Sequence, residues 1–266
     1  MKLNVLLSLL VIILLVVSGC SKKESKTLPD KEIAKQIVPF APLPSFQSIF
    51  KSLDYLNAKD IAVAIPNELY KTKQEPARNA FALGVLTADG IIAARGRNKS
   101  KLIIIANEMT NLTTLLNLEG EINALADDMK TLIEKEQWVE LEKALEKYKN
   151  DVESMLWERA DYDTYTLLIL GGWSEAANRV AWIIDQNYTM DKTQVINQKG
   201  TWSTLIKNLE SIKTEPIRKA SFYEKSIELC KQLNQVLDAD QKGKFTKEQV
   251  KQFIQYTDAI KLQFKK

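Results

Sequence analysis

Four charged residues on two apolar segments are the first candidates for chemistry. Arg78 and Asp89 lie in one segment, and Glu175 and Arg179 lie in the other. If the segments pack together, the four side chains could form a polar pocket. Asp and Glu residues can also hydrolyse a glycoside as a carboxylate pair. The alternative is that they are solvent-facing or paired structural charges. No local motif marks a catalytic pair, and 34 acidic residues make chance pairs inevitable.

The absence of histidine removes several classes of enzyme. Ser-His-Asp and Cys-His arrangements use the imidazole as a base, and the usual catalytic zinc sites and many haem sites use it as a ligand. We therefore expect a protein that is not an enzyme, with no catalytic residues and no cofactor.

Aromatic residues are frequent in the second of these segments and around it, where they could line a groove for a small ligand or a glycan. Aromatic packing in the core is the alternative explanation. The residues concerned are Trp157, Tyr162, Tyr165, Trp173, Trp182, Tyr188 and Trp202.

A loop near the C-terminus, from Asp238 to Gln249, resembles part of an EF-hand calcium loop. Asp238 and Asp240 stand at the first and third ligand positions, and Gly243 stands at the sharp turn. However, Lys242 places a cation at the fifth position, and Gln249 replaces the bidentate glutamate at the twelfth. We expect an ordinary turn between two helices and no metal site.

The N-terminus carries one lysine and then a nearly pure apolar run from Val5 to Val17. As a helix this run would rise about 20 Å, which is less than a bilayer core requires. A site of small residues follows it directly. The pattern is typical of a cleaved signal segment, and a permanent anchor helix is the alternative.

The end of this run, Val17-Ser18-Gly19-Cys20, resembles the lipobox of bacterial lipoproteins. The resemblance implies that a signal peptide, residues 1–19, is removed and that Cys20 is the lipid-attachment site, with its freed amine acylated by a palmitate-type chain. Two or three chains anchor a protein stably, whereas one chain binds marginally. It also implies an extracytoplasmic, lipid-anchored location in the cell envelope. Ser21 in place of aspartate favours the outer membrane if the source is Gram-negative.

The net charge of the chain limits the kinds of partner that it is expected to bind. Without Lys2 the mature chain has 36 basic and 34 acidic residues, a net charge of +2, and no long run is basic. We therefore expect no nucleic-acid partner.

With Cys20 lipidated, Cys230 has no cysteine to pair with, and its apolar neighbours predict a small core residue.

Apolar residues recur with helical spacing through most of the chain, and 9 glycines and 7 prolines are few for its 266 residues. This predicts an all-α, multi-helix bundle of antiparallel helical hairpins. We expect a tether over 20–44 and one globular domain over 45–266. The expected helices cover 45–56, 58–65, 75–96, 101–117, 122–133, 138–155, 161–185, 201–212, 216–237 and 246–264, with a polar connection over 188–200.

Ala80, Gly84 and Ala88 recur at every fourth position of one expected helix. Small side chains let another helix approach closely, and the charges nearby exclude a bilayer location. Leu170-Gly171 echoes Leu83-Gly84, so a weak internal duplication is an open alternative.

These observations favour a non-catalytic interaction or structural module of the cell envelope, with an envelope protein as its partner and the membrane contacted through its lipid. Binding of a small ligand or glycan in a helical groove is the alternative. A two-carboxylate hydrolase comes third.

Overall fold

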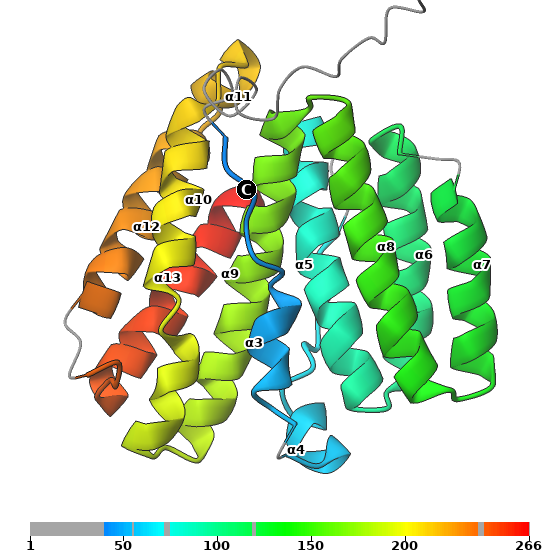
Figure 1. Cartoon of the computed structure of the whole chain (residues 1–266), viewed down its shortest axis with the longest axis horizontal. Helices are drawn as coiled ribbons and strands as arrows, with labels where there is room; N and C mark the ends of the chain where they lie inside the picture. The colour runs from blue at the N-terminus through cyan, green and yellow to red at the C-terminus, as the bar shows by residue number, and fades with distance from the viewer. Residues whose placement is uncertain (1–39, 55, 72–74, 119–120, 239–241, 266) are drawn as a thin grey trace, which may run out of the picture. The chain divides into compact units, whose positions relative to one another are not determined.

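The computed structural model describes residues 40–265 apart from 55, 72–74, 119–120 and 239–241, and it leaves the side chains of 58 and 121–126 undescribed. The lipobox, the signal segment and Cys20 lie outside these residues. Phe40–Lys266 forms one unit, and its described part is helical without strands, which confirms the all-α prediction (Figure 1). The elements are α3 (Gln47–Lys51), α4 (Ala58–Ala62), α5 (Pro76–Arg95), α6 (Lys99–Leu115), α7 (Glu121–Glu134), α8 (Trp138–Glu158), α9 (Tyr162–Gln186), the 3-10 helix η1 (Met190–Ile196), α10 (Lys199–Ser211), α11 (Glu215–Lys219), α12 (Tyr223–Asp238) and α13 (Lys247–Lys265).

Helices α5 and α9 pack against each other through glycines. A Cβ added to Gly84 would lie 1.9 Å from the Leu168 carbonyl oxygen, and one added to Gly171 would lie 2.1 Å from the Phe81 carbonyl oxygen. Only glycine permits backbones to approach this closely. The close helix crossing predicted from the small-residue spacing is confirmed, and each helix contributes a glycine to it.

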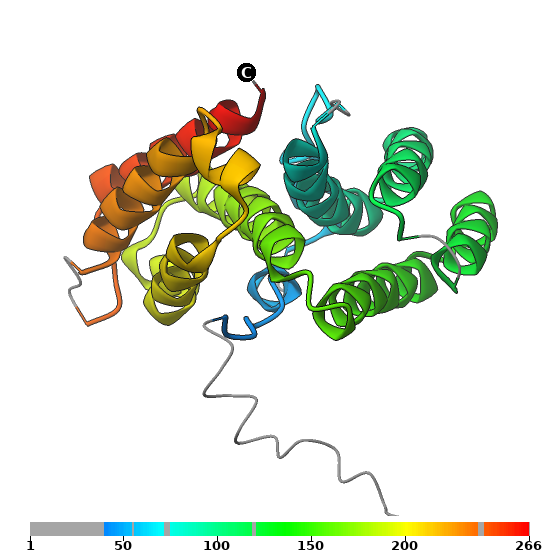
Figure 2. The same cartoon turned by 90° about the horizontal axis from the view of Figure 1, so that it is seen from above.

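The other long helices extend from this central pair on its two sides (Figure 2). α6 packs on α5, α7 on α6 and α8 on α7, while α13 packs on α9, α12 on α13 and α10 on α12. Helices α5 to α9 follow one another through short connections, which is the predicted arrangement of helical hairpins, whereas α13 packs on α9 from far along the chain. In the described part of the chain, no helix is long and apolar enough to cross a membrane.

Four connections between helices have the same type of turn. Arg97, Asn117, Glu136 and Ala160 each have a φ between 53° and 56°, directly after α5, α6, α7 and α8. In each turn the next backbone N–H donates to a carbonyl five residues earlier, as Asp161 does to Leu156 at 2.9 Å. This is the Schellman pattern, which satisfies the last carbonyls of a helix. It ends these helices without glycine at the left-handed position.

Several of the expected elements differ. The helices expected over 45–56 and 58–65 are shorter, as α3 and α4. The helix expected over 216–237 is broken into α11 and α12, because Ala220 is extended (ψ 142°). The break turns Phe222 inward, where its ring lies 4.5 Å from that of Phe264. The polar connection expected over 188–200 contains η1, whose Thr193 hydroxyl accepts a hydrogen bond from the Phe245 N–H at 2.8 Å.

The unit begins at Phe40, inside the segment expected to be a tether. The Leu43 N–H donates to the Tyr165 hydroxyl at 3.1 Å, and the Trp173 indole donates to the Pro44 carbonyl oxygen at 3.1 Å. Phe46 is fully buried and occupies the space that a side chain at Gly172 would need. Residues 40–46 are therefore part of the packed structure.

Candidate functional site

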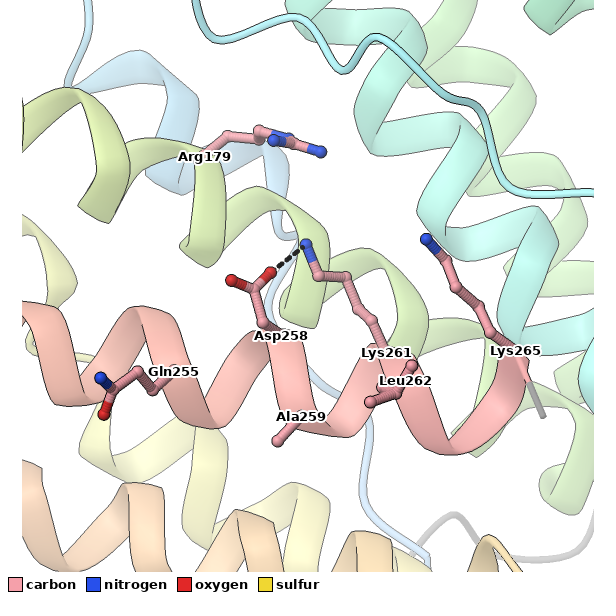
Figure 3. A pocket seen from close by; sticks show the side chains of 7 residues that line it. All are labelled: Arg179, Gln255, Asp258, Ala259, Lys261, Leu262 and Lys265. Carbon is pink, nitrogen blue, oxygen red and sulfur yellow. Dashed lines mark ion pairs between the residues drawn. The ribbon is translucent and has the colours of Figure 1, made fainter.

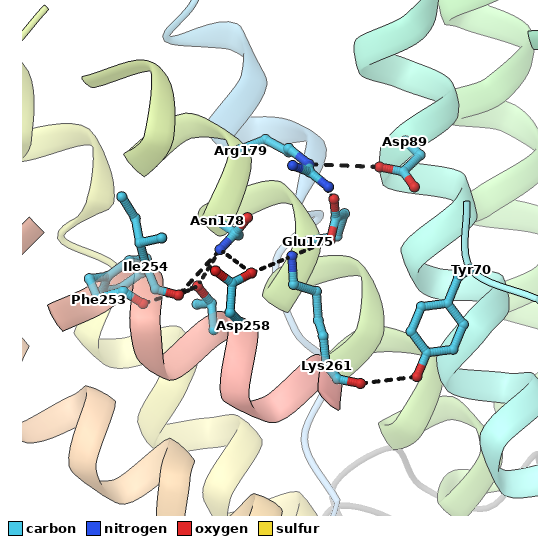
Figure 4. Close-up of polar contacts among 10 residues, drawn as sticks. Tyr70, Asp89, Glu175, Asn178, Arg179, Phe253, Ile254, Asp258 and Lys261 are labelled. Carbon is cyan, nitrogen blue, oxygen red and sulfur yellow. Dashed lines mark hydrogen bonds and ion pairs between the residues drawn. The ribbon is translucent and has the colours of Figure 1, made fainter. Parts of the chain in front are cut away.

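Three of the four charged residues singled out in the sequence meet where α9 packs against α5 and α13. Asp89 comes from α5, and Glu175 and Arg179 lie one turn apart on α9. Lys261 of α13 joins them. We call these four residues the charge cluster (Figure 4). The close helix packing encloses it, and Asp89 and Glu175 are each 1 % exposed.

Glu175 is the centre of the charge cluster because each of its carboxylate oxygens binds a cation. Oε1 accepts a hydrogen bond from Arg179 Nε, and Oε2 lies 2.7 Å from Lys261 Nζ. Arg179 Nε also lies 4.0 Å from Asp89 Oδ1. Buried ion pairs add little net stability, but removing one partner is costly because a buried charge is left alone.

The two carboxyl groups have opposite pKa shifts. Burial and the neighbouring Glu175 carboxylate raise the pKa of Asp89 well above its usual range. Burial also acts to raise the pKa of Glu175, but the attractions of Lys261 and Arg179 and its hydrogen bonds together outweigh burial and lower it to about 2. Of the two buried carboxyls, Glu175 is therefore the stronger acid and Asp89 the one whose protonated form is favoured.

A further set of bonds ties α13 to its neighbours. Asp258 Oδ1 lies 3.1 Å from Lys261 Nζ and accepts a hydrogen bond from Asn178 Nδ2 at 3.0 Å. Asn178 also donates to Thr257 Oγ1 at 2.9 Å, and the Tyr70 hydroxyl donates to the Lys261 carbonyl oxygen at 3.1 Å. These contacts fix the position of the Lys261 side chain and of the last turns of α13.

A surface pocket of about 540 Å³ opens beside the charge cluster (Figure 3). We call it the basic pocket, because three of its side chains are cations and only one is an anion. Arg179 and Lys261 belong to both the cluster and the pocket, whereas Asp89 and Glu175 do not line it. The lining residues are Arg179, Gln255, Asp258, Ala259, Lys261, Leu262 and Lys265.

Arg78, the fourth predicted residue, makes separate contacts. Its Nε lies 2.7 Å from Glu75 Oε2, and its Nη1 donates to the Gln263 carbonyl oxygen at 2.8 Å. Its guanidinium carbon lies 5.0 Å from the centre of the Phe222 ring. Arg78 thus holds the end of α13 and matches the alternative of a paired structural charge.

Lys261 was missed by the sequence analysis although it is essential to the cluster. It lies one turn after Thr257 and next to Ile260, at the edge of the buried face of α13. A lysine at such a position is a signal that could have been found, because buried lysines need a partner. The identity of that partner depends on how α13 packs on α9.

The predicted aromatic set is used mainly in packing. Trp173 and Trp202 are fully buried, and Tyr165 is 3 % exposed. The Trp157 ring packs edge-on against Tyr162 and Tyr165, with centroids 4.9 and 5.2 Å away. None of the seven residues lines the basic pocket. The members that are partly buried against the core include Trp157, Trp182 and Tyr188.

The described part of the EF-hand-like loop has other partners. Asp238 forms an ion pair with Lys199 of α10. The Gln249 side chain accepts a hydrogen bond from the Thr246 N–H at 2.8 Å and Thr246 caps the Gln249 N–H in return. Asp240 lies outside the described residues. Within those residues, no three His, Cys, Asp or Glu side chains are grouped closely enough to hold a metal ion.

Cys230 is fully buried in α12, which confirms its prediction as a core residue. Burial raises the pKa of its thiol to about 12. Because the thiolate is the reactive form, this cysteine is unreactive at neutral pH.

Protein-family models, curated proteins and solved structures were compared with the chain, and none of them matches it. The chemistry of the site therefore rests on its geometry. Both oxygens of Glu175 are bound to cations, whereas the carboxyls of a glycosidase act on the substrate between them. Three cations and one carboxylate line the basic pocket.

Proposed function

We propose that this chain is a bacterial lipoprotein, held at a membrane surface by lipid on Cys20, whose helical unit is a non-catalytic interaction or structural module of the cell envelope. The lipobox-like tetrad Val17-Ser18-Gly19-Cys20 at the end of an apolar run supports the anchor. Two or three acyl chains would keep the unit at the surface without inserting it.

One observation carries the non-catalytic part of this proposal: the charged groups of the cluster are bound to one another. Glu175 has a cation on each oxygen, and Asp89 is enclosed, with its pKa raised by burial and by the Glu175 carboxylate. A general acid or base must reach its substrate with a pKa near the working pH. These carboxyls instead hold α9 to α5 and α13, as a rigid framework for binding requires.

A second candidate function is the binding of a small ligand. The basic pocket favours it, because Arg179 and Lys261 are fixed from behind by Glu175 and face an open space of about 540 Å³. The third candidate, a two-carboxylate hydrolase, is disfavoured at this site because Asp89 and Glu175 are buried and neither lines the basic pocket.

Crosslinking in intact cells tests the interaction module. A photo-crosslinking residue would replace Leu262, at the basic pocket and 48 % exposed, or Val139 on α8, which is 61 % exposed. We expect one discrete envelope protein to be crosslinked from one of these positions. No protein adduct from either position would contradict the module. A ligand that raises the melting temperature in a screen of envelope glycans and lipids would then favour the second candidate.

A further inference from the structure

Arg179 and Lys265 bring unused cationic groups to the basic pocket (Figure 3). Arg179 uses Nε to bind Glu175, and its two terminal nitrogens donate to no described residue. Lys265 forms no ion pair with a described carboxylate, and its Nζ lies 5.5 Å from the centre of the Tyr70 ring. These groups can therefore accept an anionic ligand without breaking an existing bond.

The other cation, Lys261, is already shared. Its Nζ lies between Glu175 at 2.7 Å and Asp258 at 3.1 Å. The Lys261 and Arg179 side chains are only 10 % and 21 % exposed. Both charges are therefore held in place from within the protein, unlike surface lysines that sample many rotamers. Ligand binding would cost little side-chain entropy here, and the partial burial would strengthen each ionic hydrogen bond.

We propose that the basic pocket binds the phosphate group of a small phosphate monoester or of a lipid headgroup. The three cations outnumber Asp258 and the Glu175 carboxylate behind them by one positive charge, so the pocket attracts an anion. A guanidinium presents two parallel N–H groups to two phosphate oxygens, and an ammonium binds a third as a point charge. Arg179 and Lys265 take these roles.

The remaining groups have supporting parts. Glu175 and Asp258 are positioning residues that hold Arg179 and Lys261. Leu262, 48 % exposed on the rim, offers an apolar contact to the organic part of the ligand. This inference rests on the proposed binding role and gives it a ligand class.

Calorimetric titration of the full chain in detergent tests the inference. The probes are inorganic phosphate, glycerol 3-phosphate and a short-chain phosphatidic acid, with succinate as a carboxylate control. Lys265→Gln removes a cation that holds no ion pair, so we expect it to weaken phosphate binding about tenfold or more. Arg179→Lys keeps the positive charge but loses the two parallel N–H groups of the guanidinium, so it should weaken phosphate binding as well. Lys251→Gln, on the exposed face of α13 outside the pocket, should leave it unchanged.

The titrations distinguish a free phosphate ester from a lipid headgroup, and some results would overturn the inference. Binding of all three phosphates indicates a free phosphate ester, and binding of phosphatidic acid alone indicates a lipid headgroup. The inference is overturned if no phosphate binds, if succinate binds equally well, or if Lys265→Gln binds like the unchanged chain. A protein crosslinked in cells would still support the interaction module in each of these cases, so the two proposals fail separately.

Discussion

At the scale of single residues, identical chemical groups behave differently according to their surroundings. Asp89 and Glu175 are equally buried, yet burial raises the pKa of Asp89 while two cations lower that of Glu175. Position relative to Lys261 and Arg179 decides which carboxyl keeps the proton.

Cys20→Ser tests the anchor. The thiol of Cys20 is the group that would receive the lipid, so the variant should incorporate no labelled fatty acid and accumulate as the precursor. Metabolic labelling measures this. Cys230→Ala, which removes the only other cysteine, should label like the unchanged chain. Undiminished label in Cys20→Ser would contradict the lipobox assignment.

Ala160→Gly tests the left-handed turns. Ala160 is exposed with a φ of 55°, a conformation that costs an alanine free energy and glycine almost none. The variant should raise the free energy of unfolding by about 0.5–1 kcal/mol in urea titrations. Ala144→Gly, inside α8, should lower it by about 1 kcal/mol. A loss of stability in both variants would argue against the turn.

At the scale of elements, two helices approach closely only where the facing positions carry no side chain beyond hydrogen. α5 and α9 meet at glycines on both sides, and their backbones provide the contact. This approach also brings Asp89 of α5 near Arg179 of α9. Packing of the two helices and assembly of the charge cluster are therefore one event.

Gly84→Leu should separate α5 from α9. Its Cβ alone would lie 1.9 Å from the Leu168 carbonyl oxygen and 2.7 Å from the Gly172 nitrogen, and neither backbone atom can move freely. We expect a loss of about 1–3 kcal/mol or more in denaturant melts. Gly200→Leu is the matched control, because its Cβ would meet nothing within 4 Å. Equal stability of the two variants would show that the crossing is wrong.

The loop between α12 and α13 should bind calcium no more tightly than the millimolar range. A cation at Lys242 and an amide at Gln249 remove two carboxylate ligands, and Asp238 is paired with Lys199. Isothermal titration calorimetry checks this, with Asp238→Ala as the control. A micromolar affinity lost in that variant would make the loop a calcium site.

At the scale of the whole molecule, the charge cluster links global stability to pH. Burial raises the folded pKa of Asp89 above the ordinary value of 3.8, so its contribution to stability is complete below pH 3.8 and is lost as pH rises through the folded pKa. Glu175 acts in the opposite sense. Its contribution is complete above pH 4.5 and is lost as pH falls toward 2.

Asp89→Asn separates these effects. The amide can still donate to Glu175 and never ionises, so the variant should gain stability over the unchanged chain as pH rises above about 4. The stability difference between the variant and the unchanged chain can grow by at most about 1.4 kcal/mol per pH unit, because one proton is linked to unfolding. Urea titrations at pH 4, 6 and 8 measure the difference. Asp128→Asn, an exposed carboxyl on α7, should show almost none. A constant difference across pH would mean that Asp89 ionises normally.

Much of the fold could be predicted because helices are local. The 3.6-residue period of apolar side chains placed the long helices. The small-residue spacing around Gly84 indicated a helix contact. The break at Ala220 could not be predicted, because it accompanies the packing of Phe222 on Phe264, a contact between residues far apart in the sequence.

The charge cluster shows where local information ends. Asp89, Glu175 and Arg179 were recognisable as charges on apolar helices, but nothing in their spacing indicated which charges would meet. Lys261 lies 86 residues after Glu175 in the chain and binds it only because α13 packs on α9. Ion pairing and pKa values depend on distances of a few ångströms across helices. Periodicity in the sequence was therefore enough to predict the helices, and a local motif was enough to suggest the anchor. The pairing of the buried charges and the basic pocket came from tertiary packing alone.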